Sequence, residues 1–124
     1  MILEKPLRIG ATIRELLLTS PKVQQTVGKH IYPYLTQEEI RHAHIVYDAL
    51  GVTFEQVKDG EYPSEITLTL NCNTADYTTG IELGEAVIDV FEDHQDISVT
   101  YASCEYDNGA MMFTHSVTIN ITVE

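Results

Sequence analysis

The side chains of this sequence that could perform chemistry are few, and the histidines come first. His42 and His44 lie two positions apart, so on a β-strand both imidazoles would face one side and could share a metal ion. The sequence assigns them no third ligand, which favours histidines that are packed or exposed without a metal. His115 falls within an alternating apolar segment, and we expect it in the core.

A cysteine nucleophile is the second chemical possibility. Cys72 or Cys104 could meet His115 in space, but residues 59–124 contain no Lys or Arg that would lower a thiol pKa, and their acids would raise it. Both cysteines lie in strand-like segments, so we expect reduced thiols of the core or sheet, with a disulfide as the alternative. We therefore expect no enzyme activity, no cofactor and no metal.

A row of carboxylates, Glu82, Glu85 and Asp89, shares one face of a predicted helix. Such a row is ordinarily a solvated surface. It belongs to an uneven charge distribution: the net charge is -12, all seven Lys and Arg lie in the first 58 residues, and residues 59–124 hold 13 acids. This half cannot neutralise phosphates, which argues against specific nucleic-acid binding. The acids either repel DNA or simply keep the protein in solution.

The chain length and the ends of the sequence limit where the protein acts. With 124 residues, we expect a single domain spanning residues 1–124. No stretch approaches the ~18 apolar residues that would cross a membrane, and the N-terminus lacks a secretory signal. We therefore predict a cytoplasmic protein with no membrane partner.

Three helical segments are indicated. Pro6 can begin a helix whose apolar residues share one face up to Thr19. Ser20 and Pro21 suit the cap and first turn of a second, short helix that ends at Gly28. Residues 75–93 then follow a helical period, with Thr74 or Thr79 as the candidate cap. The inner face of this segment carries Gly80 and Gly84, which would let the helix lie close to a sheet, and the other members of that face are Tyr77, Ile81, Val87, Ile88 and Phe91.

The remaining segments indicate strands. "HIYPYL" (residues 30–35) predicts an edge strand or extended arm because of its proline, and "TQEEIRHA" (36–43) predicts a loop. "HIVYDALGVTFEQV" (44–57) predicts one long strand bent at Gly51, followed by the turn "KDGE". "EITLTLNCN" (65–73) alternates with one dry face, and a last hairpin turns at Asn108-Gly109.

These elements define an α+β fold class. We expect an antiparallel sheet of two long hairpins, with two main helices packed on one face. The other sheet face is rich in threonine, which suits water and equally suits another subunit. Strands of 10 or more residues are long for so small a domain and invite pairing outside it.

The order of these segments resembles the tail-completion or tail-terminator proteins of long-tailed phages and prophages, the small head–tail joining proteins. The resemblance covers about residues 7–123 and rests on the order and spacing of individually weak motifs. These motifs are "VGKHIYPYL", "HIVYDAL" with the following glycine, "KDGE", "ITLTLNCN", "ADYTTGIELGEAVIDVF" and "VTYASCEYDNGAMMFTHSVTINI". The sequence departs from the family in "RHAH", where such proteins commonly carry a proline.

The resemblance implies a structural protein and not an enzyme. It implies a ring of copies, usually hexameric, that caps the last ring of the tail-tube protein and ends its polymerisation. The ring would also present a surface to the head-completion or connector protein. Such a protein assembles in the host cytoplasm and finishes at the head–tail junction of the virion. A closed ring needs a heterologous contact, with different patches on the two sides of the subunit.

Two sets of residues are the candidate sites for this role. The candidate subunit-contact arm consists of Ile31, Tyr32, Pro33, Tyr34, Ile45 and Tyr47. The alternative is that Tyr32 and Tyr47 complete the core of their own subunit. The candidate acids facing the channel are Glu82, Glu85 and Asp89, which would repel passing DNA across a Debye length of ~8 Å. A different class of function is also open: a small acidic protein that mimics DNA and inhibits a DNA-binding enzyme.

Overall fold

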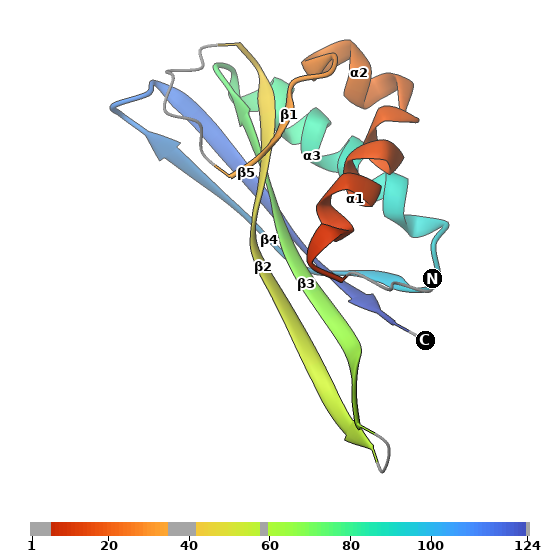
Figure 1. The fold of residues 1–124 in the computed structure, drawn as a ribbon. Coiled ribbons are helices and arrows are strands. Elements are labelled where there is room, and N and C mark those ends of the chain that lie inside the picture. Colours follow the sequence, from red (N-terminus) through yellow and green to blue (C-terminus); the bar gives the residue numbers. More distant parts are fainter. Residues whose placement is uncertain (1–5, 35–41, 58–59, 124) are drawn as a thin grey trace.

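The structure, a computed structural model, describes residues 6–34, 42–57 and 60–123. Figure 1 shows a layer of helices beside a strongly twisted sheet. The elements are η1 (Pro6–Arg8), α1 (Ile9–Leu18), α2 (Pro21–Val27), β1 (Ile31–Pro33), β2 (His44–Val57), β3 (Gly60–Thr74), α3 (Tyr77–Glu92), β4 (Ile97–Asp107) and β5 (Met112–Thr122). In the described ranges, no helix is long and apolar enough to cross a membrane.

The sheet has five strands in the order β1-β2-β3-β5-β4. Strands β2 and β3 pair antiparallel, as do β3 with β5 and β4 with β5, whereas β1 runs parallel to β2. The α+β class is therefore confirmed, but the expected antiparallel sheet is wrong because this sheet is mixed. A parallel pair needs a connection that returns the chain to its starting end, and here ten residues separate Pro33 from His44.

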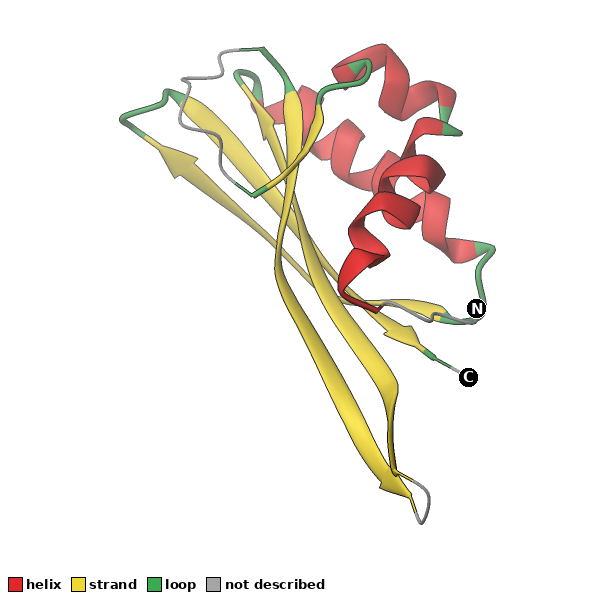
Figure 2. Cartoon of the chain, in the orientation of Figure 1, coloured by secondary structure: helices red, strands yellow, loops and turns green. Residues whose placement is uncertain are grey.

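The helices cover one face of the sheet (Figure 2). The predicted dry face of β3 is confirmed, since Ile66, Leu68, Leu70 and Cys72 are all buried. They pack with apolar side chains of the helices and of β5, among them Ile9, Ile13, Leu17, Val23, Leu83, Val87, Phe91, Val117, Ile119 and Ile121. The core therefore lies between the helix layer and the middle strands.

The short helix α2 begins and ends where the sequence indicates. The Ser20 hydroxyl accepts a hydrogen bond from the Val23 backbone N–H at 3.3 Å, and Pro21 occupies the first turn. Gly28 ends the helix with a φ of 59°, which glycine adopts without strain.

The start of α3 differs from the sequence expectation. The cap is Asp76, whose carboxylate accepts from the Thr79 N–H at 2.9 Å and from its hydroxyl at 2.8 Å. Thr74 instead donates its hydroxyl to the Asp76 carbonyl at 2.7 Å. These bonds favour the ionised carboxylate, so the Thr79 N–H and hydroxyl hold the pKa of Asp76 below its usual range.

The inner face of α3 is also rotated from the predicted one. Tyr77 is 50% exposed, while Gly80, Leu83 and Gly84 are buried together with Val87. The cause is the close approach of this helix to the sheet at Gly80, where an added methyl group would collide with the imidazole of His115.

Strand β2 bends where Gly51 predicted a bulge. Its pairing with β3 shifts between Asp48 and Gly51, and Ala49 there has a φ of 54°. A second shift follows between Thr53 and Phe54. Beyond these bends the β2–β3 hairpin projects past the helix layer (Figures 1 and 2). The first two residues of the expected "KDGE" turn, 58 and 59, lie outside the described residues, as does most of the expected 36–43 loop.

Candidate subunit-contact surfaces

The candidate contact arm divides into a buried and an exposed part. Ile31 and Ile45 are buried in the core of their own subunit. Tyr47 is half-buried and packs its ring against α1 at Gly10, where a side chain would not fit. The exposed part comprises Pro33 and Tyr34, the latter 54% exposed. Only this part of the arm presents its side chains fully to another molecule.

The arm is held in place by main-chain and side-chain hydrogen bonds. The Tyr34 N–H donates to the Tyr47 carbonyl at 2.9 Å, although Tyr34 has a φ of 56°. Arg14 on α1 donates to the Ile31 carbonyl at 3.1 Å. The position of Tyr34 therefore follows from β2 and α1, which lie on both sides of the arm.

Three imidazoles gather where the arm meets β2. The rings of His30 and His42 lie 4.0 Å apart between centroids, and those of His42 and His44 lie 6.0 Å apart. His30 Nδ1 is hydrogen-bonded to the Tyr32 hydroxyl at 2.7 Å. Among the residues that the structure describes, no group of three or more His, Cys, Asp or Glu is arranged to hold a metal ion.

His44 is the buried member of this group, only 5% exposed. Its Nδ1–H donates to the His42 carbonyl at 2.8 Å, which leaves Nε2 to accept from the Asn73 amide at 3.2 Å. Burial lowers the pKa of His44 most; the hydrogen bond to the His42 carbonyl partly offsets this, and the nearby His42 and His30 side chains lower the pKa further. The network therefore fits a neutral imidazole.

Cys72, His115 and Cys104 occupy one row across β3, β5 and β4. Both cysteines are free thiols, and burial raises the pKa of Cys72 to about 12. Cys104, by contrast, is exposed on the edge strand. His115 is buried as expected, with neither ring nitrogen hydrogen-bonded, and burial lowers its pKa. The row thus combines an inert thiol and a neutral imidazole in the core with one accessible thiol outside it.

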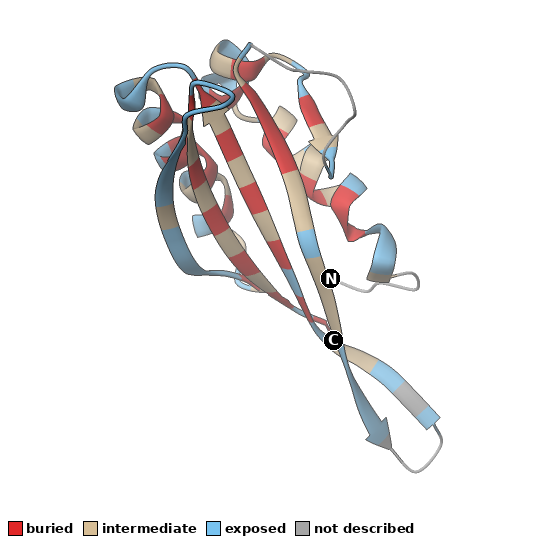
Figure 3. Ribbon diagram, turned by 90° about the vertical axis from the view of Figure 1, so that its left-hand side faces the viewer, coloured by how far each residue is buried: buried red, intermediate tan, exposed pale blue. Residues whose placement is uncertain are grey.

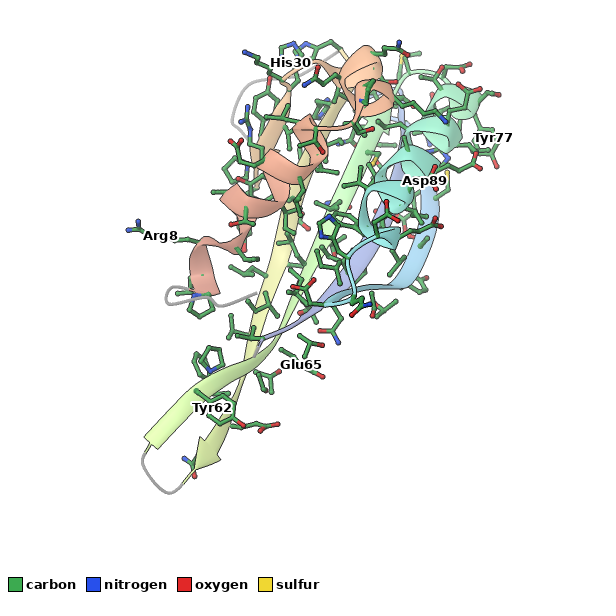
Figure 4. The ribbon with its side chains drawn as sticks, turned by 90° about the vertical axis from the view of Figure 1, so that its right-hand side faces the viewer. Arg8, His30, Tyr62, Glu65, Tyr77 and Asp89 are labelled. Atoms are coloured by element: carbon green, nitrogen blue, oxygen red, sulfur yellow. The ribbon has the colours of Figure 1, made fainter. Side chains whose placement is uncertain are left out.

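The candidate channel acids Glu82, Glu85 and Asp89 are all exposed on the outer side of α3. They line a hollow of about 370 Å³ between α3 and α2, and Lys22 is the one basic side chain among the described residues that line it. Figure 4 shows Asp89 on this outer side, away from the sheet, and the hairpin residue Tyr62 at the far end of the molecule from His30. The structure therefore brings the three acids together on one surface.

The side chains that residues 67–73 of β3 and 114–120 of β5 place on the opposite sheet face are polar and uncharged. Facing side chains on β3 and β5 are hydrogen-bonded in pairs: Thr69 with Thr118 at 3.1 Å, and the Ser116 hydroxyl with the Asn71 amide oxygen at 2.7 Å. A third pair joins the Thr114 hydroxyl to Asn73 at 2.6 Å. These groups therefore satisfy part of one another's hydrogen-bonding capacity.

Exposed aromatic side chains mark surfaces that the sequence patterns did not single out. Phe54 is 52% exposed and Tyr62 is 41% exposed on the β2–β3 hairpin. Tyr62 donates its hydroxyl to Glu55 at 2.7 Å, and these two residues are paired across the strands, so Phe54 lies on the other face of the hairpin. Tyr101 on β4 is 64% exposed. The projecting hairpin thus carries one aromatic ring on each face.

No protein-family model matches this chain, and no curated protein matches it either. Its structure is similar to a chain in a solved structure of the virion of a native gene transfer agent particle. The two share a TM-score of 0.75 and 16% sequence identity, and the match covers 94% of this chain and 94% of that chain. At this level of identity, the comparison establishes a common fold over nearly the full length of both chains.

Proposed function

We propose that this chain is a structural protein of a phage-like virion. The observation that carries the proposal is the fold it shares, across 94% of both chains, with a chain of a gene transfer agent virion. Virion proteins work by meeting copies of themselves and other proteins. The exposed aromatics Tyr34, Phe54 and Tyr101 offer the kind of surface that such contacts bury.

Within the virion we assign the chain the role of tail terminator. Copies would close into a ring, most simply a hexamer, on the last ring of tail-tube protein, stop its polymerisation, and present a surface to the head connector. The resemblance of the sequence motifs to that family supports this role. The exposed arm at Pro33 and Tyr34 and the projecting hairpin supply different patches on one subunit, as a closed ring needs.

The acids on α3 are proposed to face the DNA channel of this ring. Their support is that Glu82, Glu85 and Asp89 are exposed on a single surface and outnumber the one lysine beside them. Replacing all three by lysine should leave assembly intact and slow DNA ejection, since the wall would then bind phosphates. Normal ejection from such virions would contradict the channel assignment.

The terminator role is tested with the purified protein and its tail-tube protein. We expect native mass measurement to show capture of the chain by tube ends, and electron microscopy to show tubes that stop growing. Tyr34→Ala should weaken capture, whereas Tyr77→Ala, a similarly exposed tyrosine on α3, should not. Tubes that elongate unchanged and bind none of the chain would contradict the role.

A non-enzymatic function is part of this proposal. The buried thiol of Cys72, with its pKa raised to about 12, is not a nucleophile at neutral pH. The acidic surface of α3 also fits the alternative function, a DNA mimic that inhibits a DNA-binding enzyme. The same capture experiment separates the two, because a mimic would have no affinity for tube ends.

A further inference from the structure

Among the residues that the structure describes, no strand pairs with the outer edge of β4. This strand pairs with β5 along its length, and it is the last strand of the five in the sheet. Ile97 is its one buried residue, and Figure 3 shows the strand exposed over almost all of its length. An edge of this kind offers a row of unsatisfied N–H and C=O groups to another strand.

This edge lacks the charges and prolines that usually protect edge strands, and its one irregularity is the register shift with β5 between Val99 and Tyr101. Residues 97–104, "ISVTYASC", contain no charged residue, no proline and no glycine, and Val99 and Tyr101 are exposed. Natural proteins guard such edges with lysine, inward-pointing charges or proline. Segments of this composition are therefore expected to pair with another chain.

A matching edge lies at the other side of the sheet. Strand β1 pairs only with residues 45–47 of β2. In the described part of the chain, no strand pairs with the outer edge of β2 over residues 49–54. This second segment, "ALGVTF", is also uncharged. At ~3.3 Å per residue, the β2 segment spans roughly 20 Å and residues 97–104 of β4 roughly 26 Å, so the β4 edge is long enough to pair with the whole β2 segment.

The strand directions of the two edges are compatible. β2 is antiparallel to β3, β3 to β5, and β5 to β4, so β4 and β2 run in opposite directions. A neighbouring copy placed with its β2 beside β4 would therefore extend the sheet by an antiparallel pair and keep its helices on the same side. Because the two edges differ, the contact is heterologous and can close a ring.

We propose that residues 97–104 of β4 pair with residues 49–54 of β2 in the next copy, so that the sheet continues from subunit to subunit. The inference deepens the proposed function, because it rests on copies of the chain meeting in a ring. The partner is a second copy of this chain, bound mainly by main-chain hydrogen bonds, as in strand addition. β1 pairs with β2 up to residue 47, so the β2 edge is available only beyond that residue. In an antiparallel contact this end of the β2 edge lies beside the end of the uncharged β4 segment, which stops before Glu105.

Disulfide trapping tests this β4–β2 contact between copies, called the seam below. In a Cys104→Ser background, one new cysteine on β4 (S98C, V99C or T100C) is combined with one on β2 (V52C, T53C or F54C). Buried Cys72 stays unreactive because its pKa is about 12. Oxidation is carried out at about 1 mM protein, a concentration that populates contacts with millimolar dissociation constants. Cysteines directly opposite across the seam fall within disulfide reach.

A heterologous contact predicts a ladder of disulfide-linked multimers beyond the dimer for at least one pair. Side chains at consecutive β2 positions point to opposite faces of the sheet. T53C and F54C are therefore matched controls for each other, because only one of them should link to a given β4 cysteine. A11C on the exposed side of α1, combined with the same β4 cysteine, should give no ladder. Val99→Lys should abolish the ladder with the melting temperature unchanged, whereas Ala110→Lys in the following turn should keep it.

Three outcomes would overturn the seam. The first is disulfide-linked dimers of variants that carry a β4 cysteine and no β2 cysteine, which would indicate that β4 pairs with itself. The second is the absence of linkage from every β4–β2 pair of cysteines. The third is a ladder that persists in the Val99→Lys variant. Failure of the seam is distinguishable from failure of the proposed function. A chain that caps tail tubes but forms no β4–β2 disulfide keeps its virion role and loses this interface.

Discussion

The contact between α3 and His115 gives the sharpest test of the fold. Gly80→Ala places a methyl group against the His115 ring and within 2.8 Å of the Thr74 hydroxyl oxygen, which is itself held by the Asp76 carbonyl. The ring has little room to withdraw, because Tyr77 lies over it at 5.4 Å between centroids. Overpacking of this kind lowers the free energy of unfolding by about 1–3 kcal/mol.

The matched control lies one turn along the same helix. A methyl group at Gly84 would meet the nearest His115 atom at 3.8 Å, an ordinary contact. Gly84→Ala should therefore show only the gain in helix propensity, about 1 kcal/mol. The same gain offsets part of the collision in Gly80→Ala, which leaves a net loss of up to about 2 kcal/mol.

Thermal or urea unfolding of the two variants measures these changes. For a domain of this size, 1 kcal/mol corresponds to about 4 °C in melting temperature, so the variants should shift in opposite directions. Removing the His115 ring should relieve the collision in Gly80→Ala. The double variant Gly80→Ala with His115→Ala should therefore lose less stability than the sum of the losses of the two single variants. If Gly80→Ala is as stabilising as Gly84→Ala, the close approach of α3 to the sheet is incorrect.

Three further predictions concern the buried histidines, the α2 cap and the thiols. The pKa values of His44 and His115 are lowered in the folded protein, so below about pH 6.5 the unfolded chain binds more protons than the folded one. The melting temperature should therefore be highest above that pH and fall as the solution is acidified. The fall should be smaller in His115→Leu. Ser20→Ala should lower the free energy of unfolding by about 1 kcal/mol, measured by urea titration. Alkylation followed by mass spectrometry should modify Cys104 in the native protein and Cys72 only after unfolding; equal native rates would contradict the burial of Cys72.

The sequence predicted most where a local physical rule acts alone. Pro21 after a serine fixed the start of α2, and the strict alternation of β3 identified its buried face. Gly51 marked the bulge of β2. These features depend on backbone geometry and period within one segment, which a sequence displays directly.

Features set by distant parts of the chain were predicted less well. Val99 and Tyr101 alternate with Ile97 as if they faced a core, yet both are exposed because β4 is an edge strand and its register shifts between these two residues. The parallel direction of β1 is similarly invisible in a three-residue strand. Of the candidate arm, the burial of Ile31 and Ile45 leaves Pro33 and Tyr34 as the part able to meet a partner.

The two surfaces that the composition suggested lie on opposite sides of the molecule. The acids of α3 are on the outer side of the helix layer, whereas the threonine and asparagine pairs of β3 and β5 are on the uncovered face of the sheet. In a ring with a continuous sheet, one of these surfaces lines the channel and the other faces outward. Lysines at Glu82, Glu85 and Asp89 would therefore slow DNA ejection only if the helix layer faces inward. Lysine at Thr118, in the uncovered face, would slow ejection only if the sheet does, so the pair of variants determines the orientation of the subunit.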